Sequence, residues 1–151
     1  MNDRRDFLRL ATAASLARLL ANAEPVLSGE RAAHPFAAGS PESVYAALGL
    51  AALVESTAIV IHAPDVAENG AQVPLEVTVR LPRVQRILLI AEGNRFPLLA
   101  DIRLNERSKP WLEAKVKLAE SSRIRVIAEA DGRLHTATRD VRVIVGGCLP
   151  G

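Results

Sequence analysis

Three segments of this chain alternate strictly between apolar and polar side chains, and this period of two constrains the fold more than any other feature. Every second residue is apolar in 74–81 (PLEVTVRL), 111–118 (WLEAKVKL) and 139–145 (RDVRVIV). Successive side chains of a β-strand point to opposite faces, so the pattern is typical of strands with one buried and one exposed face. A nearly continuous apolar run at 86–92 (RILLIAE) predicts a central strand.

Turn and capping signals complete the prediction of the fold. Asp131-Gly132 stands between two strand runs and predicts a hairpin, because the tight turn needs positive φ. Ser40 is a good helix cap and Pro41 suits a first helical position, so we expect a short helix there, with Gly49 near its end. About seven short strands separated by turn signals predict an all-β fold, an antiparallel β-sandwich with a short N-terminal helix.

The first 23 residues have the layout of an export signal. Arg4 and Arg5 are adjacent, an Ala-rich stretch of weak hydrophobicity follows, and residues 21–23 (ANA) match a cleavage site. The arginine pair indicates the twin-arginine route of bacteria, which exports folded proteins. The alternative is an amphipathic helix that starts the fold, and Arg18 favours it by interrupting the apolar stretch. Membrane spans need ~20 apolar residues, so we expect no span and a periplasmic protein.

Composition argues against nucleic acid as a partner. The chain has 19 basic and 17 acidic residues, and residues 1–23 hold four arginines and two aspartates, which leaves 15 of each sign. No run of five basic residues occurs, whereas phosphate neutralisation needs clustered positive charge. After the signal, we interpret residues 24–40 as a linker, 41–145 as a single sandwich domain and 146–151 as a flexible C-terminal arm.

No familiar set of catalytic or cofactor-binding residues appears in the sequence. His34, His62 and His135 are scattered without the spacing of metal ligands, and each is expected to be an ordinary surface or packed side chain. Nucleophile-elbow, P-loop and dinucleotide-binding motifs are absent from the sequence. We therefore expect a protein that is not an enzyme and has no metal site and no cofactor.

Cys148 is the one cysteine of the chain, and it follows the last strand-like run. In an exported protein a single cysteine pairs between chains, stays free or carries a group. Gly146 and Gly147 precede it, and residues without a Cβ restrain the backbone little. A thiolate at the end of such a stalk is an exchangeable sulfur nucleophile that can enter a pocket of another protein.

The chain resembles the SoxY family, the sulfur-carrying subunit of thiosulfate oxidation. The resemblance rests on three stretches, APDVAENGAQVPLEV at 63–77, VKLAESSRIRVIAEADGRLHTATRDVRV at 116–143 and GGC at 146–148. It implies an immunoglobulin-like sandwich that pairs with a SoxZ-like subunit and is exported with it. It also implies that Cys148 binds the sulfur substrate, that Gly146 and Gly147 form the hinge of the arm, and that sulfur-oxidising partner enzymes process the bound group.

Two stretches depart from the family pattern. Leu149, Pro150 and Gly151 follow the cysteine where the family usually has two glycines, and Arg95 stands in EGNRFPLL where a proline more often follows the asparagine. Two other interpretations remain open. In the first, Cys148 makes an intermolecular disulfide that links a dimer. In the second, the chain is an exported adaptor whose strand edge recruits a partner.

Overall fold

The computed structural model describes residues 34–144, and the all-β sandwich with one short helix is confirmed. Seven of the described strands have four residues or more, and two have only two residues. Within this range no helix has both the length and the apolar character needed to span a membrane. The elements are η1 (Pro35–Ala37), α2 (Pro41–Leu48), β1 (Val54–Glu55), β2 (Ile59–His62), β3 (Val66–Ala67), β4 (Val73–Val79), β5 (Val84–Ala91), β6 (Leu98–Arg103), β7 (Trp111–Val116), β8 (Ser122–Ala130) and β9 (Arg133–Val143).

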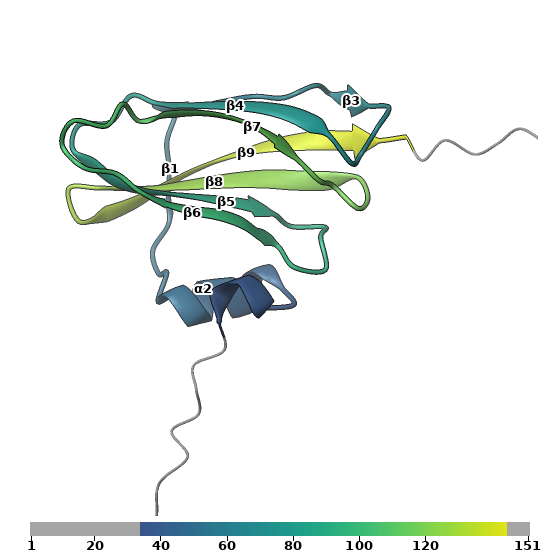
Figure 1. Cartoon of the computed structure of the whole chain (residues 1–151). Coiled ribbons are helices and arrows are strands. Elements are labelled where there is room, and N and C mark those ends of the chain that lie inside the picture. Colours follow the sequence, from purple (N-terminus) through teal and green to yellow (C-terminus); the bar gives the residue numbers. More distant parts are fainter. Residues whose placement is uncertain (1–33, 145–151) are drawn as a thin grey trace, which may run out of the picture. The chain divides into compact units, whose positions relative to one another are not determined.

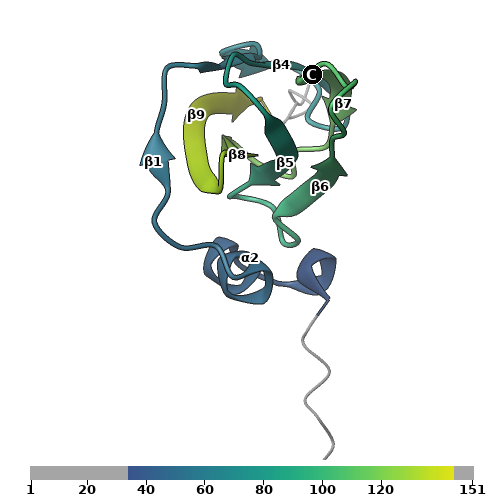
Figure 2. The same ribbon diagram turned by 90° about the vertical axis from the view of Figure 1, so that its left-hand side faces the viewer.

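The strands form two sheets that face each other (Figure 1). The larger sheet has the order β1-β9-β8-β5-β6, and β3 also pairs with β9. The smaller sheet has the order β2-β4-β7. All pairs are antiparallel except β1 and β3, which both run parallel to β9 at different places along its edge. Figure 2 shows how β9 curves, so that its two halves meet different short strands.

The main core lies between the two sheets and follows the alternation of the sequence. On β4, Leu75, Val77 and Val79 are at most 2% exposed, while the residues between them face outward. The larger sheet contributes the inward residues of β5 and β8 to the same cluster, including Ile87, Leu89, Ile124, Val126 and Ala128. The prediction from PLEVTVRL is thus confirmed at the level of single side chains.

A second core lies on the opposite face of the larger sheet, under α2. Val44 of the helix is fully buried there and contacts the cluster formed by Leu88, Ile90, Leu98, Ile127 and Ala38. Residues 87–91 of β5 are consequently buried on both faces, because the smaller sheet covers one face and the helix the other. This explains why RILLIAE is a nearly continuous apolar run. Ala38 lies in the segment 24–40 that the sequence predicts to be a linker, so the last part of that segment packs on the sheet.

The helix has the ends that its sequence predicts. The side chain of Ser40 accepts a hydrogen bond from the backbone N–H of Ser43 at 3.2 Å, and Pro41 occupies the first turn. Gly49 ends the helix with φ +64°, in the left-handed region that glycine adopts without strain. Between β8 and β9, Asp131 and Gly132 both have positive φ and form the predicted hairpin.

Half-buried ion pairs stabilise the helix-side face of the larger sheet. Arg86 of β5 binds Asp101 of β6 with two hydrogen bonds of 2.7 Å, which its Nε and Nη2 donate to the two carboxylate oxygens. The hydrogen bonds from Arg86 lower the pKa of the Asp101 carboxyl below its ordinary value, although burial opposes the shift. Nearby, Arg125 binds Glu92 at 2.7 Å beside Tyr45 of the helix, whose pKa is raised by burial.

Val44→Thr is expected to lower the free energy of unfolding by about 2 kcal/mol. The substitution keeps the shape of the side chain but places a hydroxyl in the apolar second core. Urea denaturation measures the change. Ala46→Ser, at an exposed position of the same helix, is the matched control and should change the stability by less than ~0.5 kcal/mol. Equal effects of the two substitutions would show that the helix does not pack on the sheet as described.

Asp101→Asn is expected to lower the free energy of unfolding by about 2 kcal/mol at pH 7, because it removes a bidentate partner of a half-buried arginine. Since the folded pKa of Asp101 lies below its unfolded value of ~3.9, its contribution is present above that value and is lost as the pH falls through the folded pKa. Denaturation of both proteins at pH 7 and below pH 4 should show the difference shrinking in acid. A difference that is constant with pH contradicts the assignment.

Candidate functional site

The residues that the sequence singles out for carrying a group lie outside the described part of the chain. Cys148, Gly146 and Gly147 belong to 145–151, and the export arginines Arg4 and Arg5 belong to 1–33. The structure does describe the base from which the cysteine segment starts, which is the end of β9 at Val143 and Ile144.

Three consecutive backbone N–H groups at this end of β9 all donate hydrogen bonds. Arg142 donates to the carbonyl of Asp65 at 2.9 Å, and Ile144 donates to the carbonyl of Ala67 at 3.0 Å, so β3 holds the strand from one side. Val143 donates to the hydroxyl Oγ of Ser121 at 3.0 Å on the other side. The chain is therefore held as far as Ile144, four residues before Cys148.

Gly70 allows the loop before β4 to approach this base closely. A Cβ placed on Gly70 would lie 2.5 Å from the carbonyl oxygen of Leu118 and 2.9 Å from Cγ1 of Val143, which no real side chain tolerates. The backbone uses this approach, because Leu118 donates to the carbonyl of Gly70 at 2.7 Å. Glycine is needed at this position for steric reasons, since Gly70 lies close both to Leu118, just after β7, and to Val143 of β9.

In the polar depression next to this base, both lining aspartates are paired with arginines. It has a volume of about 720 Å³ and is lined by Asp65, Ser121, Ser122, Arg123, Asp140, Val141 and Arg142. Arg123 binds Asp140 at 3.0 Å, and Arg139 binds Asp65 at 2.5 Å. The two serine hydroxyls of the lining accept hydrogen bonds from the backbone, Ser121 from Val143 at 3.0 Å and Ser122 from Gly93 at 2.8 Å.

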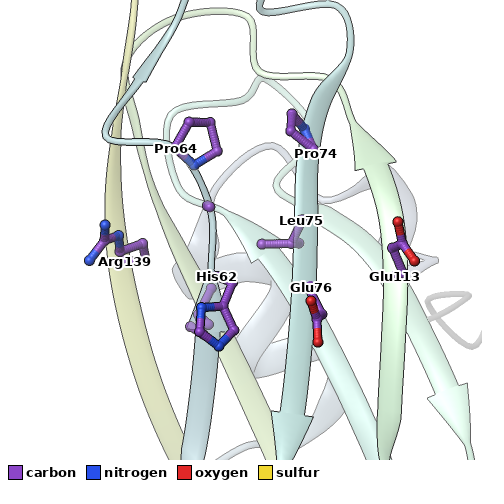
Figure 3. Close-up of a pocket in the computed structure, with 9 residues that line it drawn as sticks. His62, Pro64, Pro74, Leu75, Glu76, Glu113 and Arg139 are labelled. Carbon is purple, nitrogen blue, oxygen red and sulfur yellow. The ribbon is translucent and has the colours of Figure 1, made fainter.

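A second depression, of about 400 Å³, lies on the outer face of the smaller sheet (Figure 3). His62, Glu76 and Glu113 are direct neighbours across β2, β4 and β7, and Arg139 of β9 lies on the far side of His62. Two carboxylates opposite each other repel, and the indole N–H of Trp111 offsets this by donating to Glu76 at 2.9 Å. Within residues 34–144 no three potential ligands are close enough to hold a metal ion.

The histidines do not converge on a site. His34 caps η1, with its ring 5.7 Å from the ring of Phe36, and His135 lies on β9 opposite Ala128, away from the row that contains His62. Arg95, one of the two sequence departures, is exposed in the turn between β5 and β6, with its guanidinium 5.5 Å from the ring centre of Phe96. The sequence indicated that EGNRFPLL is unusual, but it carried no signal that Arg95 and Phe96 are exposed together.

Comparisons with known proteins agree on one family. A family model described as sulfur oxidation protein SoxY matches residues 44–148. The solved structure of the sulfur carrier protein SoxY from Chlorobium limicola f thiosulfatophilum is 34% identical, with a TM-score of 0.62 over 68% of this chain and 89% of that chain. Among curated proteins, the search found no match.

Superoxide reductases share the architecture at lower identity. One solved structure of the superoxide reductase (neelaredoxin) from Ignicoccus hospitalis is 19% identical, with a TM-score of 0.52 over 70% of this chain and 93% of that chain. Another structure of the same reductase is 20% identical, with a TM-score of 0.51 over 66% of this chain and 87% of that chain. At these identities the likeness shows a common fold alone.

Gly70→Ala is expected to lower the free energy of unfolding by about 2–3 kcal/mol, because the added methyl overlaps a backbone oxygen that cannot rotate away. Hydrogen exchange of the Val143 and Ile144 amides should accelerate more than that of the amides of β5. Gly39→Ala is the matched control, because its Cβ would meet only one atom, at 4.0 Å. Unchanged exchange at Val143 and Ile144 would contradict the role of Gly70 in holding the end of β9.

Proposed function

Because this chain belongs to the SoxY family of sulfur oxidation proteins, we propose that it is a non-catalytic carrier that holds a sulfur-oxidation intermediate on Cys148. The observation that carries the proposal is the family match, which extends from residue 44 to residue 148 and so reaches the one cysteine of the sequence. The carrier presents its cargo to partner enzymes of thiosulfate oxidation, which supply the catalysis.

The geometry of the described base supports this role. Hydrogen bonds hold the chain up to Ile144, and four residues of extended chain span at most ~14 Å. Gly146 and Gly147 form the hinge of this short tether, since they lack the Cβ that restricts backbone angles. The thiol then enters the active site of a partner while the sandwich stays outside.

The loading chemistry defines what the first partner must be. A bond between the Cys148 sulfur and the outer sulfur of thiosulfate forms with loss of the thiol proton and two electrons. The loading partner is therefore an oxidoreductase with an electron acceptor of its own. The described part of the carrier supplies a well-held base for the arm.

The proposal includes export and a second subunit. Residues 1–23, with Arg4 and Arg5, direct the folded protein to the periplasm by the twin-arginine route, residues 24–40 link the signal to the sandwich, and residues 146–151 form the arm. A SoxZ-like β-sandwich subunit accompanies the chain, since proteins exported in the folded state can cross as complexes. The competing function is an exported adaptor whose Cys148 links two chains by a disulfide, and the single cysteine favours it to the same degree.

Intact mass spectrometry of the protein from its native exporting cells distinguishes these functions. In cells that oxidise thiosulfate, protein purified without reductant should carry sulfur or a sulfur oxyanion on Cys148 that disappears on reduction. Its N-terminus should lie after residue 23. Cys148→Ala should carry no added mass and should abolish thiosulfate oxidation, because the attachment atom is gone.

Two other results would contradict the carrier function. A doubled mass that reductant halves would show that Cys148 links two chains. A clean monomer mass from cells that actively oxidise thiosulfate, with activity retained in Cys148→Ala, would show that the chain carries no sulfur. Lys109→Ala, on the β6–β7 connection and exposed, is the control for effects of substitution and purification and should behave as the unaltered protein.

A further inference from the structure

Two exposed residues at the end of the sandwich that holds the arm, Arg95 and Phe96, form a surface that the proposed function leaves unexplained. Phe96 is 51% exposed, although the chain has only three phenylalanines. The guanidinium of Arg95 lies over its ring, 5.5 Å from the ring centre. Arg95 forms no ion pair with any of the other described residues. We call these two residues the arm-end patch.

The topology places this patch at the same end as the base of the arm. β5 and β9 are both antiparallel to β8, so they run in the same direction and end at the same end of the sheet (Figure 1). Hydrogen bonds connect the two ends through β8. Val143 donates to Ser121 at 3.0 Å, and Gly93 donates to the hydroxyl of the next residue, Ser122, at 2.8 Å.

The turn that carries the patch is held firmly. The side chain of Asn94 donates to the carbonyl of Lys117 at 2.8 Å and accepts from the N–H of Ala119 at 2.9 Å. Pro97 is buried directly after the patch. A half-exposed aromatic ring on a turn with this many bonds is pre-organised for contact, since little conformational freedom remains to be lost on binding.

The length of the arm identifies the partner. Cys148 lies four positions after Ile144, so an enzyme that acts at the Cys148 sulfur must bring its surface within ~14 Å of Ile144. A typical interface covers ~800 Å² on each partner, a disc roughly 30 Å across. β5 and β9 lie on either side of β8, so at a strand spacing of ~4.8 Å their ends are about 10 Å apart, and such a disc centred on the base of the arm reaches the β5–β6 turn. Aromatic and arginine side chains are the ones that most often anchor such interfaces.

We propose that the arm-end patch is the docking surface for the oxidoreductase that loads sulfur onto Cys148. This inference rests on the proposed function and specifies how the carrier is recognised. The enzyme presents an apolar pocket that takes the Phe96 ring and a carboxylate at its border that pairs with Arg95. The patch contributes affinity and the arm contributes the reacting atom, so loss of the patch weakens binding without changing the chemistry at sulfur.

The test measures loading of the full chain, purified with any subunit that accompanies it and reduced beforehand. A periplasmic extract of native cells that lack the gene supplies the enzymes, thiosulfate supplies the sulfur, and intact mass spectrometry follows the mass gained on Cys148 at several carrier concentrations. The double substitution Arg95→Glu with Phe96→Ser should raise the half-saturating carrier concentration about ten-fold at an unchanged maximal rate. Arg107→Glu makes the same charge change in the β6–β7 connection, at the far end of β6, and should leave both values unchanged.

Each other outcome overturns a defined part of the inference. If the half-saturating concentration of the double variant stays within two-fold of the unaltered protein, the patch does not dock the enzyme. If the variant loses its accompanying subunit on purification, the patch belongs to the subunit interface instead. If the unaltered protein itself gains no mass, the carrier function fails, and the docking inference fails with it. An intact fold of the variant, checked by its urea midpoint, keeps these results separate from unfolding.

Discussion

Apolar burial on both faces of the central strands is the constraint on which the other layers depend. Leu89 and Val126 point toward the smaller sheet, whereas Leu88 and Ile127 point the other way, and both sets are almost fully buried. One layer cannot cover both faces, so the fold needs the β2-β4-β7 sheet on one side and α2 on the other. The helix is therefore an integral layer of the sandwich, although it is only eight residues long.

The two ends of the sandwich are built differently. The end with Asp131-Gly132 is closed by a tight hairpin turn, and an exposed ion pair, from Arg83 to Asp131, connects this turn to another segment. The end from which the cysteine segment leaves is held by side chains, with Ser121, Ser122 and Asn94 each bonding to the backbone of another segment. In the function proposed above, a firm base at Ile144 limits the volume that Cys148 can reach, which raises the effective concentration of the thiol at a docked enzyme.

Much of the fold could be predicted because the signals were local. Alternation located the buried face of β4, the apolar run located β5, and Ser40, Pro41 and Gly49 located the helix ends. The parallel pairings of β1 and β3 with β9 could not be predicted, since each involves two residues that meet a strand far away in the sequence. RDVRVIV predicts a strand, but only the structure shows that residues 139–143 continue the strand that begins at Arg133.

Two features could be read from the sequence without coordinates, the sandwich class and the candidate attachment atom. Burial of alternating side chains is a local property of each strand, and a single cysteine after the last strand-like run is visible in the sequence. The surroundings of the start of the arm, in contrast, depend on contacts between distant segments. The base at Ile144, the close approach at Gly70 and the exposed Arg95 and Phe96 come together from segments distant in the chain. Their proximity follows from the order and direction of the strands, because β5 and β9 run in the same direction and end at the same end of the sheet. No local sequence pattern encodes that order.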